Sequence, residues 1–254
     1  MARDPERRSA AHSRRAAWIA AGFVLAVILL FFAYTANYCR ADESAEKALA
    51  SDGTVAVVST DYGVLFDGPS GDSALIFYPG GKVDENAYAP LLHRIAAGGL
   101  DVCLVRMPFR LAVFGMNRAD AVMAEHSYQN WYIGGHSLGG AIAANYAAGH
   151  GGALRGLILL AAYPTKALGD DLRLLSIYGT EDGVLQMDPY EKGKQYWPSD
   201  SAELVIDGGN HAQFGNYGVQ SGDGTAGISA AEQQAMTAER ILALLGADAV
   251  MPAA

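Results

Sequence analysis

The sequence predicts an α/β protein with a doubly wound, mainly parallel sheet, preceded by one apolar N-terminal helix. From Ser73 onward, short apolar runs alternate with segments of helix-forming composition, which is the pattern of strands connected by helices. The apolar runs are continuous, as in strands that are covered on both faces. The length of 254 residues and the 51% hydrophobic content suit one large domain with a substantial core.

The N-terminal region carries the signature of a membrane helix. Residues 1–15 are a basic, arginine-rich tail, and the run 16–39 that follows has no charged residue. This run exceeds the apolar core of a signal peptide, which is about 7–15 residues, and is long enough to span a bilayer. The arginines predict a cytoplasmic N-terminus and a domain outside, tethered to the membrane by one helix. Small residues at 33, 36 and 41 leave cleavage, and hence a secreted domain, as the alternative.

Charge and composition limit the classes of partner. Residues 41–254 contain 12 basic and 25 acidic residues, a formal net charge of −13. So acidic a domain argues against a nucleic-acid partner, because a phosphate backbone requires a positive surface. No spacing of histidine, cysteine or carboxylate residues is typical of a metal site. We therefore expect a small-molecule substrate and neither a metal nor a cofactor.

The predicted elements follow one another without an internal repeat. Residues 40–53 form a polar, alanine-rich linker with room for a short helix, and the domain spans 54–254. Two short strands, 55–58 and 64–66, are joined by polar turns and predict an antiparallel edge. The remaining strands are predicted at 74–78, 101–106, from 131, at 156–161, 172–178 and 203–206, and the helices at 84–97, 118–125, 141–148 and 230–245.

The strand that begins at Trp131 ends in Gly135–His136–Ser137–Leu138–Gly139 and leads into a helix. This is the G-x-S-x-G pattern, in which a serine sits on a strained turn between strand and helix with its hydroxyl projecting outward. The glycines are required because side chains two residues away would collide with neighbouring backbone. We interpret Ser137 as a nucleophile. Taken alone, the pattern also fits an ordinary turn that carries a surface serine, so the interpretation depends on its partners.

Those partners are predicted at the carboxyl ends of later strands, where α/β sheets carry their active groups. Asp182 follows the strand 172–178, and His211 follows the strand 203–206. A serine hydroxyl needs an imidazole to accept its proton, and the imidazole needs a carboxylate to hold its tautomer. The chain order serine, aspartate, histidine agrees with that arrangement. Glu181 and Asp207 remain alternative acids, whereas His211 is the only histidine at a strand end after the nucleophile.

A tetrahedral oxyanion requires two fixed N–H donors. The backbone of Leu138, the residue after the nucleophile, is predicted to supply one. The second is predicted in the Gly80–Gly81–Lys82 loop, where bare backbone can approach closely; Gly81 is the preferred donor and Lys82 the alternative. The same residues also fit a simple turn.

The chain resembles the α/β-hydrolase superfamily, and in particular its dienelactone-hydrolase-like branch, over nearly all of residues 54–247. The resemblance is carried by four segments: Tyr78–Val83, Gly135–Gly140, Gly179–Gly183 and Gly208–Phe214. It implies an eight-stranded sheet, a Ser137–Asp182–His211 triad and an oxyanion hole from Leu138 and the 80–82 loop. Dienelactone hydrolases carry cysteine where this chain has Ser137, which argues against that substrate. Little sequence is present for a cap between residues 163 and 171, so we expect an open or shallowly covered site.

The sequence therefore predicts a serine hydrolase that cleaves carboxylic esters of small or medium acyl groups through an acyl-enzyme. An acyltransferase would use the same triad, and a non-catalytic binding module could share the scaffold. The Gly- and Asn-rich segment 214–224 follows His211 closely. We expect it to form one wall of the substrate pocket together with residues 107–109 and Phe114, although it also fits a surface loop.

Overall fold

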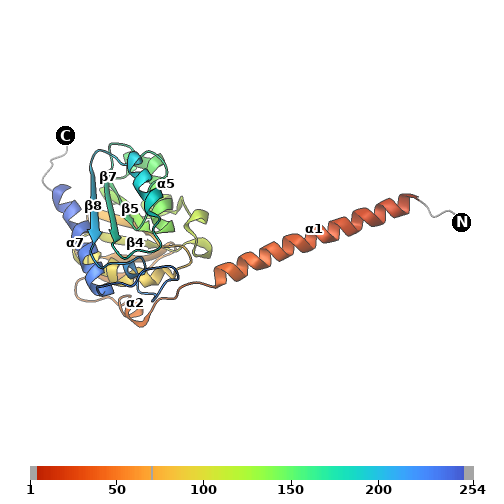
Figure 1. The fold of residues 1–254 in the computed structure, drawn as a ribbon. Helices are drawn as coiled ribbons and strands as arrows, with labels where there is room; N and C mark the ends of the chain where they lie inside the picture. The colour runs from red at the N-terminus through yellow and green to blue at the C-terminus, as the bar shows by residue number, and fades with distance from the viewer. Residues whose placement is uncertain (1–4, 70, 249–254) are drawn as a thin grey trace. The chain divides into compact units, whose positions relative to one another are not determined.

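A computed structural model of the chain describes residues 5–69 and 71–248. The chain divides into two compact units, with the boundary between Tyr38 and Cys39 (Figure 1). The first unit contains helix α1, Pro5–Ala36, of which the stretch Trp18–Ala36 is long and apolar enough to cross a membrane. A signal sequence near the N-terminus passes the same test. The basic tail predicted at 1–15 is helical from Pro5, and residues 1–4 lie outside the described chain.

The second unit is built on an eight-stranded sheet in the order β1-β2-β4-β3-β5-β6-β7-β8. All neighbours from β4 to β8 pair in parallel, and β2 pairs antiparallel with both β1 and β4. This confirms the mainly parallel sheet and its antiparallel edge. The strands are β1 Ala56–Ser59, β2 Gly63–Asp67, β3 Ser73–Tyr78, β4 Asp101–Val105, β5 Asn130–His136, β6 Gly156–Leu160, β7 Arg173–Gly179 and β8 Ser201–Ile206.

Helices cover the sheet on both faces (Figure 1). Helices α3 (Ala89–Ala97) and α7 (Ala230–Asp248) contribute to one core cluster, and α4 (Arg118–Glu125) and α5 (Leu138–His150) contribute to the other. Successive residues of β3 alternate between the two clusters: Leu75 and Phe77 belong to the first, Ile76 and Tyr78 to the second. Both faces of the strand are therefore dry, which is the physical reason for its continuous apolar run.

Three segments differ from the sequence-based expectation. The predicted linker, 40–53, is packed on the second unit: its helix α2, Glu43–Lys47, buries Ala45. The predicted helix 84–97 begins as a 3₁₀ turn, η1 Glu85–Tyr88, because Pro90 has no N–H for the carbonyl of Asn86 and an α-helix cannot continue through it. Helix α6, Met187–Gly193, was not predicted; it is short and polar and has no clear apolar periodicity.

Candidate active site

Ser137 lies on the turn between β5 and α5. Its backbone has φ 52° and ψ −124°, a conformation that is strained for a residue with a side chain. The turn is held on one side by a hydrogen bond from Ser137 N to Leu160 O (2.9 Å) and on the other by one from Ala141 N to Ser137 O (3.0 Å). The strain is thus imposed by the neighbouring strand and the helix start, which is the backbone geometry expected of a nucleophile elbow.

The glycines on either side of Ser137 allow β3, β5 and α5 to approach closely. A Cβ atom at Gly135 would overlap Tyr78 O, and one at Gly139 would overlap the carbonyl oxygens of Tyr78 and Pro79. These obstacles are backbone atoms at the end of β3, so they cannot rotate away. The collision expected from the sequence is therefore present, and the elbow depends on both glycines.

Substituting Gly139 by alanine is expected to lower the free energy of unfolding by about 3 kcal/mol or more, since the added methyl group must push α5 away from β3. Gly149 is the matched control, because it lies in the same helix and has open space around it. Gly149→Ala is expected to stabilise the protein by about 0.5–1 kcal/mol through helix propensity. Urea denaturation of both variants checks this; equal effects at the two positions would contradict the packing argument.

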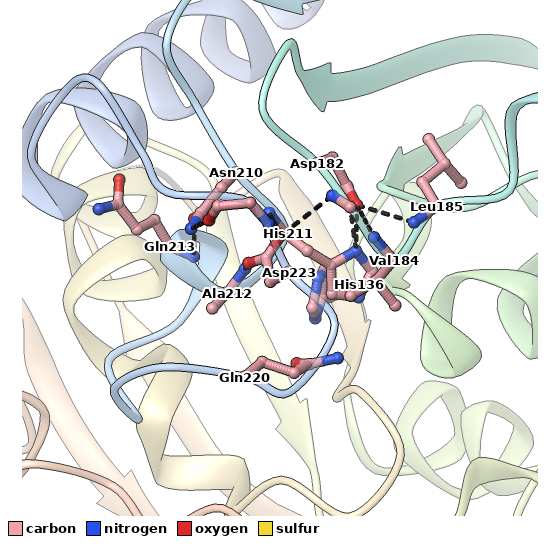
Figure 2. Close-up of polar contacts among 12 residues, drawn as sticks. His136, Asp182, Val184, Leu185, Asn210, His211, Ala212, Gln213, Gln220 and Asp223 are labelled. Atoms are coloured by element: carbon pink, nitrogen blue, oxygen red, sulfur yellow. Dashed lines mark hydrogen bonds and ion pairs between the residues drawn. The ribbon is translucent and has the colours of Figure 1, made fainter.

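Asp182 and His211 form a buried pair beyond the carboxyl ends of β7 and β8. His211 Nδ1 lies 2.9 Å from Asp182 Oδ2 and 3.1 Å from Oδ1, and the two side chains are 2% and 1% exposed. Figure 2 shows the carboxylate directed toward the imidazole. Asp182 Oδ1 also accepts hydrogen bonds from the backbone N–H groups of Val184 (2.9 Å) and Leu185 (2.7 Å). The carboxylate is thereby held as an acceptor, and His211 donates from Nδ1.

A second carboxylate, Asp223, joins the two loops that carry this pair (Figure 2). Its Oδ1 accepts from the N–H groups of Gly183 and His211, each at 3.1 Å, and its Oδ2 accepts from Ala212 N at 2.8 Å. Gln233 of α7 forms two hydrogen bonds with the backbone of Asn210, the residue before His211: its Oε1 accepts from Asn210 N, and its Nε2 donates to Asn210 O. Sequence reasoning missed Asp223, although its position between Gly222 and Gly224 marks a tight turn.

Ser137 and His211 line the same pocket, which has a volume of about 290 Å³. His211 Nε2 is buried and makes no hydrogen bond within the described residues, so it is available to a proton donor in the pocket. Two connections contribute most of the remaining lining: Ala161, Ala162, Tyr163 and Thr165 after β6, and Val184, Leu185 and Gln186 after β7. Leu138 and Ala141 of α5 also line the pocket. Within the described chain, no group of three histidine, cysteine or carboxylate side chains could hold a metal ion.

The pocket wall expected from the segment 214–224 is not found there. Neither this segment nor residues 107–114 contribute to the lining of the pocket that contains Ser137. Residues of the segment line a different pocket together with Asp42 and Ala230. The segment lies close to His211 because the Asp223 carboxylate accepts hydrogen bonds from the backbone N–H groups of His211 and Ala212. It therefore contacts the backbone of the histidine loop and does not line the pocket. Sequence proximity to His211 could not distinguish these two sides.

The loop after β3 meets the start of α5, as an oxyanion hole requires. A Cβ atom on Gly81 would lie 2.8 Å from Leu138 Cδ2, so only a glycine lets the loop approach this closely without displacing Leu138. Gly80 N donates to the Tyr88 hydroxyl (3.0 Å), and Lys82 N donates to Arg110 O (2.9 Å). The N–H of Gly81, between them, makes no hydrogen bond among the described residues. These contacts favour Gly81 over Lys82 as the second donor.

The ring of His136, the residue before Ser137, lies against the ring of His211. The ring centroids are 4.4 Å apart. The Tyr88 hydroxyl accepts from Gly80 N (3.0 Å) and forms a second hydrogen bond with His136 Nδ1 (2.8 Å). His136 is fully buried, and burial lowers its pKa well below the ordinary value, with the adjacent His211 adding to the effect. In the sequence, His136 was visible only as the variable residue before Ser137 in the G-x-S-x-G pattern, with no role assigned to it.

The pKa shift of His136 predicts acid sensitivity of the fold. Because the folded pKa lies below the unfolded value of about 6.5, protonation favours the unfolded state, and stability falls with pH below about 6.5. This one group contributes a slope of up to about 1.4 kcal/mol per pH unit and nothing above that range. We expect His136→Asn to flatten the dependence of unfolding free energy on pH between about 5 and 6.5. An unchanged slope in urea titrations at several pH values would contradict it, with His150→Asn as the surface control.

A serine on a strand–turn–helix elbow, beside an aspartate–histidine pair at the carboxyl edge of a mainly parallel sheet, is the arrangement of a hydrolase. The chain belongs to the alpha/beta hydrolase family, whose model matches residues 74–235. No curated protein sequence matches the chain.

Solved structures share this fold at low sequence identity. A membrane phospholipase A, described as a bacterial virulence factor, is 12% identical with a TM-score of 0.58, covering 96% of this chain and 100% of its own. Carboxyl esterase 2 from the fungus Tuber melanosporum is 12% identical with a TM-score of 0.56, over 82% and 89% of the two chains. Dienelactone hydrolase from Anabaena variabilis is 12% identical with a TM-score of 0.54, over 73% and 95%.

Proposed function

We propose that the protein is a serine esterase that cleaves carboxylic esters of small or medium acyl groups through an acyl-enzyme on Ser137. The observation that carries the proposal is the buried Asp182–His211 pair at 2.9 Å, with His211 lining one pocket together with Ser137. Carboxylesterases among the structures of similar fold agree with this chemistry. Ser137, Asp182 and His211 form the catalytic triad in this proposal, and Leu138 and Gly81 form the oxyanion hole.

Each residue then has a definite task. His211 Nε2 takes the proton of Ser137 Oγ as the oxygen bonds to the ester carbonyl carbon, and Asp182 stabilises the imidazolium that forms. The N–H groups of Leu138 and Gly81 bind the oxyanion. Collapse of the tetrahedral intermediate breaks the ester C–O bond, and His211 passes its proton to the departing alcohol oxygen. A water molecule, deprotonated by His211, then attacks the acyl carbon, releasing the acid and regenerating Ser137. No step requires a metal or a cofactor.

In the same proposal the chain is a single-pass membrane protein, with the basic tail 1–15 in the cytoplasm and the catalytic domain on the other side. The apolar stretch Trp18–Ala36 supports the span, and the arginines before it support the orientation. The short connection between β6 and β7 supports an open site, since it spans only residues 161–172 and has no room for a cap domain.

The direct test is labelling of the full-length protein with a fluorophosphonate, which reacts covalently with an activated serine, followed by mass spectrometry of the peptides. We expect one adduct per chain, located on Ser137, and turnover of a short-chain p-nitrophenyl ester that the label abolishes. Labelling that leaves esterase activity intact, or an adduct on another serine, would contradict the proposal. A folded protein that neither labels nor hydrolyses the ester would favour a binding module.

A further inference from the structure

The segment between β4 and α4 exposes an unusual amount of apolar surface. Phe109, Val113, Phe114 and Met116 are all exposed, and Phe114, the most accessible of them, retains 53% of its surface. The rings of Phe109 and Phe114 contact each other edge to face, with centroids 5.7 Å apart. Two short 3₁₀ turns, η2 Pro108–Arg110 and η3 Ala112–Phe114, present these side chains on a compact loop. We call residues 106–118 the aromatic loop.

The charge of the aromatic loop is opposite to that of the domain. Arg106, Arg110 and Arg118 lie within the loop and line a common pocket with Glu85, and residues 106–118 include no acidic residue. Residues 41–254 as a whole carry a net charge of −13, so three arginines in this short stretch form a local basic site on an acidic body. Glu85 pairs with Arg106 at 2.7 Å, so one carboxylate offsets part of this local positive charge. Exposed aromatic groups flanked by arginines fit an anionic lipid surface.

The aromatic loop adjoins the proposed oxyanion hole. Arg110 O accepts the hydrogen bond from Lys82 N, and Leu111 Cδ2 lies 3.7 Å from the position of a Cβ on Gly81. The loop therefore borders the catalytic machinery without lining the pocket that contains Ser137. A membrane surface in contact with the aromatic loop would therefore lie close to the proposed oxyanion hole.

The covalent chain brings the same region close to the proposed membrane span. Cys39 N donates to Lys82 O, and Asp84 N donates to Cys39 O, both at 2.8 Å. Only Asn37 and Tyr38 lie between Cys39 and Ala36, the last residue of α1. A chain extends by at most about 3.6 Å per residue, so the Lys82 backbone cannot be much more than about 11–14 Å from the end of a spanning helix, whatever its orientation. One lipid headgroup layer is about 5–8 Å thick, so the Lys82 backbone lies within about two such thicknesses of the end of the span.

From these observations we propose that the aromatic loop docks on the anionic headgroup region of the bilayer that holds α1, and that the esters hydrolysed at Ser137 are presented by that bilayer. The second part rests on the proposed function, whereas the docking does not. The phenylalanines enter the interface, the arginines contact lipid phosphates, and the oxyanion loop lies at the membrane surface.

Docking is tested by tryptophan quenching in the full-length protein, reconstituted in nanodiscs that contain phosphatidylcholine with brominated acyl chains and phosphatidylglycerol. Phe114→Trp places the probe on the aromatic loop; Val205→Trp is the control, with similar exposure (41%) on β8 at the opposite end of the sheet. Both variants carry Trp18→Phe to remove the tryptophan of α1. We expect brominated lipid to quench the probe at 114 about twofold or more and the probe at 205 hardly at all.

Equal quenching of the two probes would overturn the docking. Equal quenching at position 114 with and without phosphatidylglycerol would overturn the role of the arginines.

A kinetic experiment compares the double variant Phe109→Ser/Phe114→Ser with Val205→Ser. In the double variant we expect hydrolysis of a long-chain ester embedded in the nanodisc to fall about tenfold, and hydrolysis of soluble p-nitrophenyl butyrate to change less than about twofold. Equal loss on both esters would overturn presentation by the bilayer. If neither ester is cleaved by the unmodified protein, the proposed function fails, and the quenching still decides the docking.

Discussion

Ser137→Ala is expected to reduce kcat/KM for a p-nitrophenyl ester by about 10⁴-fold or more, because the variant has no atom that can form the acyl-enzyme. His211→Ala is expected to lose a similar factor, and the double variant no more than either single one, since the two residues act as a unit. The elbow should persist in Ser137→Ala, because its backbone is held by Leu160 O and by the start of α5, not by the hydroxyl.

Thr165→Val is the control for Ser137→Ala. It removes another hydroxyl from the same pocket without touching the proposed triad, and we expect a loss of less than about tenfold. Thermal unfolding should show the variants to be folded, with melting temperatures within a few degrees of the unmodified protein. If Ser137→Ala retains more than a small fraction of the activity while Thr165→Val loses it, the nucleophile has been assigned to the wrong residue.

Asp182→Asn is expected to reduce kcat by about 10⁴-fold with little change in KM. The new side chain can keep its carbonyl oxygen on the N–H groups of Val184 and Leu185, so its NH₂ group faces His211 Nδ1. That arrangement favours the tautomer with the proton on Nε2, which cannot accept the proton of Ser137. The fold should change little because the loop contacts are retained.

The alternative acids serve as matched controls for Asp182→Asn. Glu181 and Asp207 lie near the same strand ends and are exposed, and we expect Glu181→Gln and Asp207→Asn to stay within about threefold of the unmodified rate. Steady-state kinetics on a soluble ester separates kcat from KM for each variant. Activity lost in Glu181→Gln and retained in Asp182→Asn would reverse the assignment of the acid.

The strands could be predicted because their cause is local. A strand covered on both faces needs an apolar residue at every position, and β3, β4 and β6 carry that pattern in the sequence itself. The short antiparallel edge was predicted from its polar turns. The strand pairing confirms the antiparallel edge and the parallel strands. Helix α6 and the 3₁₀ start of the 84–97 helix depend on single residues such as Pro90 and on tertiary contacts, so periodicity could not predict them.

By itself the sequence determined the family, the elbow and the candidate residues Ser137, Asp182 and His211, because the glycines around the serine and the order of the strand ends are properties of the chain. Only the tertiary structure decided how these groups are supported. Asp223 lies 12 residues from His211, and Tyr88 lies 48 residues from His136; each contact depends on loops that the sheet brings together. The side on which the 214–224 segment lies, and the hydrogen bond from Cys39 N to Lys82 O, were likewise decided by packing between distant segments. The local sequence pattern predicts which secondary structure a segment forms. Which distant segments it contacts depends on the free energy of the whole fold.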